Sequence, residues 1–194
     1  MTEADRTAID LAQFELLAAT RRTSLRMDKG RSVPIEVIER LCRVAMWAPN
    51  HHKTWPWRFA HFTGDGRARL GSTIADALEA DGFDDERKLE KYRVKYTRAP
   101  SMLVVGSAAG STSIETLENR DAVSAGVQNL LLAATAAGLA SFWSSGAPVA
   151  DDAVAALCRW EPDSAVVAVI YLGWPDAELP SPERPLPAIT EIDH

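Results

Sequence analysis

The segment Val166–Gly173, with the sequence VVAVIYLG, carries the strongest strand signal in the chain. It is rich in β-branched residues and contains no charge, which is typical of a strand buried on both faces of a sheet. Ser101–Gly106, with the sequence SMLVVG, is a second, shorter run of the same kind. We therefore predict a central sheet built around these two segments.

Further patterns on either side of these two segments complete the expected architecture. Helical spacing of apolar residues marks 9–20, 34–48, 67–80, 84–96, 117–138 and 151–158, and strands are expected at 57–63 and 140–144. Because long helical segments separate the strands, we expect a three-layer arrangement with helices on both sides of the sheet. Five of the eleven prolines lie beyond Gly173, so residues 1–194 are expected to form one domain with an extended tail from about Leu179.

Composition and charge exclude several classes of protein. A net charge of -6 argues against a general nucleic-acid binder. The longest apolar stretch, Val127–Ala140, is interrupted by polar residues and is too short to span a bilayer, so no membrane partner is expected. The acidic N-terminus lacks the features of a signal peptide. Together with Cys42 and Cys158, interpreted as reduced thiols, this predicts a cytoplasmic protein.

The motifs of several enzyme classes are missing from the chain. The four histidines show no metal-ligand spacing, and neither cysteine belongs to a CxxC pair, so no metal site is predicted. The chain has no GxxxxGK[ST] loop, no GxGxxG and no GxSxG elbow. Hydrolysis by a triad or by a resident metal ion is therefore not expected.

Arginine and tryptophan are concentrated in two short stretches. Arg21, Arg22 and Arg26 lie within six residues, and Trp47, Trp55 and Trp57 lie within eleven. Arginine suits bidentate contacts to phosphate or carboxylate, and tryptophan suits stacking on flat rings. The clusters indicate either a site for a small anionic, aromatic ligand or a solvated helix end beside a buried aromatic cluster.

Four segments, taken together in this order and spacing, resemble the FMN-dependent nitroreductase family, in particular its small YdjA-like branch. They are Arg21–Arg26 (RRTSLR), Trp47–Phe59 (WAPNHHKTWPWRF), Ser141–Pro148 (SFWSSGAP) and Ile170–Pro175 (IYLGWP). The resemblance covers residues 21 to 175. It implies an α+β, three-layer fold in which helices flank a central, mostly antiparallel sheet.

The resemblance also implies a set of cofactor-binding residues. The family's positions for the FMN phosphate are matched by Arg21, Arg22, Thr23 and, in the tail, Arg184. Its positions that line the flavin ring are matched by Trp143, Ser144 and Ser145. A stretch linked to nicotinamide nucleotide binding is matched by Ala133, Ala134, Thr135, Ala136, Ala137 and Gly138. Trp47 and His51 match positions that reach the flavin from the other subunit. Arg26 falls one residue later than the family's usual arginine, so its role stays open.

The activity that the resemblance implies is flavin-dependent oxidoreduction. NADH or NADPH would pass a hydride to FMN, and a nitroaromatic, quinone or similar flat acceptor would then enter the same cleft in a ping-pong scheme. No side chain needs to act as an acid or base, so no catalytic residue is nominated. The expected assembly is a homodimer with FMN at the interface, consistent with the apolar character of the helix expected at 117–138.

Two alternatives remain at this stage. One is a non-catalytic flavin-binding protein of the same fold, and the other is an all-helical interaction module whose arginines and tryptophans serve a protein interface.

Overall fold

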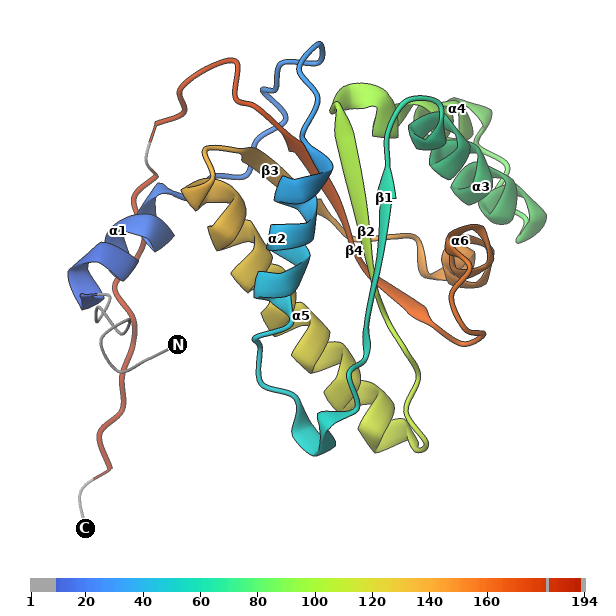
Figure 1. Cartoon of the computed structure of the whole chain (residues 1–194). Helices are drawn as coiled ribbons and strands as arrows, with labels where there is room; N and C mark the ends of the chain where they lie inside the picture. Colours follow the sequence, from blue (N-terminus) through green and yellow to red (C-terminus); the bar gives the residue numbers. More distant parts are fainter. Residues whose placement is uncertain (1–9, 181, 193–194) are drawn as a thin grey trace.

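Four antiparallel strands form the sheet at the centre of the computed structural model, which describes residues 10–180 and 182–192 (Figure 1). The strands are β1 (Trp57–Phe62), β2 (Ser101–Ser107), β3 (Ala140–Ser144) and β4 (Ala165–Gly173), and they are ordered β1-β2-β4-β3. All four lie where the sequence predicted strands. The sheet rules out the all-helical alternative.

The two apolar segments that predicted the sheet occupy its centre. β2 and β4 pair with each other, Val104 lying opposite Val169, and every residue of β2 is buried. Successive side chains of β2 point to opposite faces: Leu103 and Val105 belong to one core, and Met102 and Val104 to the other. A strand that supplies both cores needs apolar residues at every position, which explains the unbroken apolar pattern.

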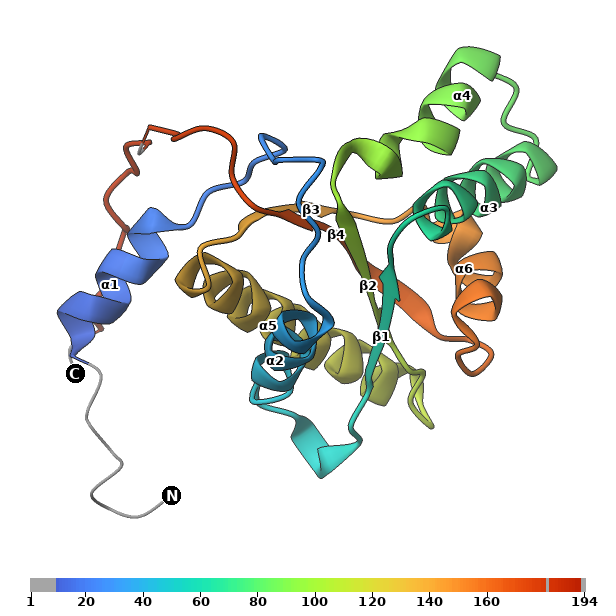
Figure 2. The ribbon, with the colours of Figure 1, turned by 45° about the horizontal axis from the view of Figure 1, so that its top comes forward.

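Helices cover both faces of the sheet, which confirms the predicted three-layer α+β fold (Figure 2). α2 (Ile35–Ala45) and α5 (Ser113–Ala136) pack on one face. α3 (Gly66–Ala80) and α6 (Asp151–Cys158) pack on the other, and α4 (Glu86–Lys95) packs on α3. The hydrophobic effect of burying both faces holds the layers together.

The long helix α5 begins four residues before the predicted start at Leu117. Thr112 precedes it, and its side-chain oxygen accepts a hydrogen bond from the backbone N–H of Glu115 at 3.1 Å. The apolar pattern starts only after this capped first turn, so periodicity alone placed the start too late. No helix among the described residues has the length and apolar composition needed to cross a membrane.

A close approach between α2 and α5 depends on Gly126. A Cβ atom at this position would lie 2.6 Å from Nε1 of Trp57 and 2.7 Å from the carbonyl oxygen of Ala45. Both distances are shorter than van der Waals contact, so only glycine permits this spacing. The contact fixes the C-terminal end of α2 and, with it, the loop that carries Trp47 and His51.

α1 (Leu11–Thr20) and the C-terminal tail lie on the side of the molecule away from α3, α4 and α6 (Figure 1). α1 buries none of its residues. The described tail residues after Leu179 form neither helix nor strand, as predicted for this proline-rich segment. Nε of Arg22 donates a hydrogen bond to the carbonyl oxygen of Pro180 at 3.1 Å and so joins the tail to the end of α1.

His61 on β1 makes the stability of the fold dependent on pH. Its Nε2 lies 3.1 Å from Oγ of the buried Ser101, and burial lowers the pKa of His61 below 6.5. The pKa of this histidine is lower in the folded protein than in the unfolded chain. Its contribution to the stability of the fold is therefore complete at a pH above the unfolded pKa and is lost as the pH falls through the folded pKa. We expect urea unfolding to show lower stability at about pH 5.5 than at about pH 7.5, with a smaller difference in His61→Gln. An equal difference in both proteins would remove His61 as the source.

Candidate functional site

Three arginines from two distant parts of the chain line one cavity, here called the arginine cavity. Arg21, Arg22 and Thr23 follow α1, Arg184 comes from the tail, and Leu179, Pro180 and Pro182 complete a lining around about 310 Å³. No carboxylate is found among these lining residues. Guanidinium groups and a hydroxyl form charge-assisted hydrogen bonds to phosphate oxygens, so this set of donors fits a phosphate dianion. The structure thus brings all four predicted phosphate-binding residues together.

Arg22 holds the tail against the segment that follows α1. Besides its bond to Pro180, its guanidinium donates to the carbonyl oxygen of Arg21 at 2.8 Å and to that of Ala19 in the last turn of α1. Nη1 of Arg21 lies 3.4 Å from Oγ1 of Thr23. The hydrogen bond from Arg22 holds Pro180 beside the arginine cavity, so Arg184, four residues later, also lines this cavity.

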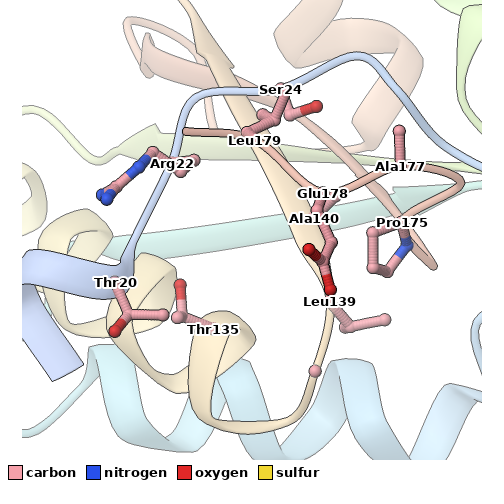
Figure 3. Close-up of a pocket in the computed structure, with 11 residues that line it drawn as sticks. Thr20, Arg22, Ser24, Thr135, Leu139, Ala140, Pro175, Ala177, Glu178 and Leu179 are labelled. Atoms are coloured by element: carbon pink, nitrogen blue, oxygen red, sulfur yellow. The ribbon is translucent and has the colours of Figure 1, made fainter. Parts of the chain in front are cut away.

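A second cavity of about 330 Å³ adjoins the arginine cavity and shares Arg22 and Leu179 with it. Figure 3 shows Thr20 at the end of α1 beside Thr135 near the end of α5, with Pro175 and Ala177 across from them. Thr20, Ser24 and Glu178 also line this cavity, and the sequence pattern singled out none of them. Only the folded chain shows that they share a surface.

The six residues predicted for a nicotinamide nucleotide do not share one surface. Thr135 and Gly138 line the second cavity, whereas Ala134 is completely buried in the core. Ala133, Ala136 and Ala137 face α2 and line a different hollow together with Val37, Arg40, Leu41 and Val44. A helix turns about 100° per residue, so consecutive positions point in different directions. The structure therefore places two of the six residues beside the arginine cavity.

Of the residues predicted to line the flavin ring, Trp143 and Ser144 end β3 and Ser145 follows it. Ala140, at the start of this strand, borders the second cavity, and Trp143 follows about 10 Å away at 3.3 Å per residue. The backbone N–H of Ser24 donates to the carbonyl oxygen of Ser141 at 2.9 Å, which joins the segment after α1 to β3. Trp143 is 37% exposed, and Oγ of Ser144 donates to the carbonyl of Ser145 at 3.1 Å. The second cavity, which adjoins the arginine cavity, therefore reaches the start of β3, whereas Trp143, Ser144 and Ser145 lie outside the lining of both cavities.

Trp47 and His51 lie elsewhere: Trp47 follows the end of α2, and His51 lies beside Glu118 near the N-terminal end of α5. Trp47 is 84% exposed, and Nδ1 of His51 lies 2.9 Å from Oε2 of Glu118. Glu118 and Thr135 are separated along α5 by about 25 Å at 1.5 Å per residue. This separation keeps His51 away from the second cavity, and neither Trp47 nor His51 lines the second cavity or the arginine cavity of its own chain.

Arg26, whose role the sequence left open, belongs to a structural contact. Its Nε lies 3.3 Å from Oδ1 of Asp176, and its carbonyl oxygen accepts a hydrogen bond from the backbone N–H of Asp176 at 3.2 Å. Met27 forms a bridge with Pro175 next to this pair. Arg26 thus ties the segment after α1 to the end of β4 and is absent from the lining of both cavities.

The four-stranded antiparallel sheet between helices and the arginine cavity beside the second cavity match the architecture expected of a nitroreductase-like protein. The chain belongs to the nitroreductase family, whose model matches residues 18–174. This confirms the family and the fold that the four segments predicted. Membership supports the expectation of an NAD(P)H-dependent flavin oxidoreductase that uses FMN.

Known proteins similar to the chain include one curated relative and two solved structures. The "Putative NAD(P)H nitroreductase YfhC" of Bacillus subtilis is 31% identical over 168 residues, which is 86% of each chain. A nitroreductase-like family protein from Bacillus cereus is 23% identical, with a TM-score of 0.75 over 96% of this chain and 94% of that one. A nitroreductase with bound FMN from Bacteroides fragilis is 18% identical, with a TM-score of 0.73 over 92% of this chain and 98% of that one.

Proposed function

We propose that the protein is an FMN-dependent NAD(P)H oxidoreductase that reduces nitroaromatic, quinone or similar flat, electron-poor acceptors. The observation that carries this proposal is the arginine cavity in a chain of the nitroreductase family. Two comparisons support it: YfhC is named as a putative NAD(P)H nitroreductase, and the Bacteroides fragilis protein has bound FMN.

In this proposal different groups of residues bind the phosphate of FMN, its ring and the nicotinamide nucleotide. Arg21, Arg22, Thr23 and Arg184 hold the phosphate of FMN by charge-assisted hydrogen bonds. Trp143, Ser144 and Ser145 contact the ring, and Thr135 and Gly138 contact the nicotinamide nucleotide. When bound, FMN supplies the hydride-transfer chemistry, so the chain need supply no acid or base.

Turnover tests the proposed function. We expect NADH or NADPH oxidation to require an added nitroaromatic or quinone and to give parallel lines in double-reciprocal plots, because donor and acceptor use the same cleft in turn. Lines that intersect would mean that both substrates bind together. A flavin-loaded protein whose absorbance is not bleached by NADH or NADPH would favour the non-catalytic flavin-binding alternative and overturn the enzymatic one.

We further propose a homodimer with FMN at its interface. The proposal is supported by His51, which contacts Glu118 about 25 Å along α5 from Thr135 of the second cavity, so it would serve another subunit's flavin rather than its own, and we assign Trp47 the same role. α1 buries none of its residues, and the tail presents Leu186, 93% exposed, and Ile189, 79% exposed. Apolar side chains arranged in this way indicate a surface that a partner covers.

Light scattering tests this assembly. A dimer of two 21.1 kDa chains is expected at low micromolar concentration. Replacing Leu186 and Ile189 together by glutamate should shift the protein toward monomer and reduce its bound FMN, because two charges would have to enter an apolar interface. Val94→Glu on α4, on the other side of the molecule, is the matched control and should stay dimeric. A wild-type monomer that retains FMN and activity would contradict the proposal.

The two cysteines support our inference of a cytoplasmic location. Both are free thiols, and they lie on α2 and α6 on opposite faces of the sheet. Burial raises the pKa of Cys42 to about 11 and that of Cys158 to about 12. Both thiols therefore stay protonated and unreactive near neutral pH, as expected for packing residues of a protein in a reducing compartment.

A further inference from the structure

Lys95, the last residue of α4, has surroundings that set it apart from the other lysines. All the lysines lie in the described part of the chain, and Lys95 alone among them is half-buried; the exposed ones are Lys29, Lys53, Lys88 and Lys91. Nζ of Lys95 lies 3.8 Å from the ring centroid of Tyr92 and 4.8 Å from that of Tyr96. Tyr96 is completely buried and stacks on Tyr171 of β4, so the core fixes its ring in place. The amine is thus held against two aromatic rings while part of the side chain stays open to solvent.

The nearest carboxylates of α3 and α4 are occupied by another cation. Nη2 of Arg93 lies 3.5 Å from Asp76 and 3.2 Å from Glu79 on α3, and its Nη1 lies 3.7 Å from Glu86 on α4. Within the described residues Lys95 forms no salt bridge with any carboxylate. Its amine therefore lacks the negative partner that would hold it in the ammonium form.

This environment leaves part of the Lys95 amine neutral near physiological pH. An aromatic face attracts an ammonium ion, but the loss of hydration between the rings has the larger effect. Burial, followed by the positive charge of Arg98, lowers the pKa of Lys95 to about 8. At pH 7.5 about a quarter of such an amine is neutral, compared with about 0.1% of an exposed lysine with a pKa of about 10.4. The neutral amine is the nucleophilic form.

Positive charge also borders the solvent-exposed side of Lys95. Lys91 precedes it by one helical turn on the same face of α4, and Arg98 follows it in a short 3-10 turn (Tyr96–Arg98). In a chain with a net charge of -6, this local basic surface attracts small anions. An acyl phosphate combines such an anionic group with an electrophilic carbonyl carbon.

We propose that Lys95 is an acylation site and that an acyl phosphate is the donor. The lone pair of Nζ attacks the carbonyl carbon, an N–C bond forms, and the C–O bond to the phosphate breaks. The departing phosphate takes the electron pair of that bond and, through water, one proton of the amine, which leaves an uncharged amide on Lys95. The site is independent of the proposed function, because α4 lies on the side of the molecule away from α1 and the tail, which form the arginine cavity (Figure 2).

Incubation of the FMN-loaded protein with acetyl phosphate, followed by peptide mass spectrometry, tests the site. At pH 7.5 Lys95 should be acetylated about tenfold faster than Lys29 or Lys53, which serve as internal controls. Its rate should level off above about pH 8, where the amine is already neutral, whereas the rates at the two exposed lysines should keep rising to about pH 10. Acetylation of Lys95 no faster than that of the exposed lysines would overturn the proposal.

Arg98→Gln tests the role of the neighbouring charge. It removes a cation that both lowers the pKa of Lys95 and attracts the phosphate, so acetylation of Lys95 should slow by about threefold or more. Arg87→Gln, about 12 Å from Lys95 along α4, is the matched control and should change the rate by less than about twofold. Equal rates in the two variants would contradict this recognition of the donor. Selective acetylation of Lys95 in a protein without NAD(P)H turnover would support the site and contradict only the proposed function.

Discussion

Replacing Arg21 by alanine should weaken FMN binding by about tenfold to a hundredfold. The substitution removes a charge-assisted hydrogen bond to the phosphate, worth about 1.5–3 kcal/mol. Arg184→Ala should have a similar effect, because Arg184 lines the same cavity from the tail. Bound flavin can be measured by fluorescence after ultrafiltration and identified by chromatography once heat has released it.

Arg26→Ala is the matched control for these two variants. It removes the same kind of side chain only a few residues away, but Arg26 pairs with Asp176 and lines neither cavity. Its FMN affinity should stay within about twofold of the wild type, since exposed ion pairs contribute little. If Arg21→Ala and Arg184→Ala retain FMN as well as Arg26→Ala does, the arginine cavity is not the phosphate site. Release of FAD instead of FMN would contradict the cofactor assignment.

Leu130→Ala should lower the free energy of unfolding by about 2–5 kcal/mol. Leu130 is completely buried on α5, in the core shared with α2 and the sheet. Its truncation removes transfer free energy and leaves a cavity between two elements that are already in tight contact at Gly126. Urea unfolding at one fixed protein concentration measures the change, because a dimer's stability depends on concentration.

Val94→Ala on α4 serves as the control for this prediction. Val94 is also apolar but is 50% exposed, so its truncation should change stability by no more than about 0.5 kcal/mol. Equal losses in the two variants would show that burial on α5 does not determine the stability of the fold. If Leu130→Ala lowers the free energy of unfolding but leaves the amount of FMN bound per folded chain unchanged, the substitution acts on core packing and not on the FMN site.

Local patterns were enough to predict the strands and most helix positions. The apolar run Val166–Gly173 became the central strand β4, because a strand between two helical layers must be apolar at every position. The start of α5 was missed, since its first turn is stabilised by the Thr112 cap rather than by apolar burial. Arg21, Arg22 and Thr23 could be nominated for one site because the segment that contains them resembles the nitroreductase family.

The sequence by itself therefore determined the secondary structure, the three-layer arrangement and, through four spaced motifs, the family. Only the tertiary structure decided which side chains share a surface. It brought Arg184 to Arg21, separated Thr135 from Ala134, and set His51 and His52 against Glu118. The reason is physical: periodicity records which face of an element is buried, whereas contacts between distant segments depend on how the packed layers place the ends of helices and loops.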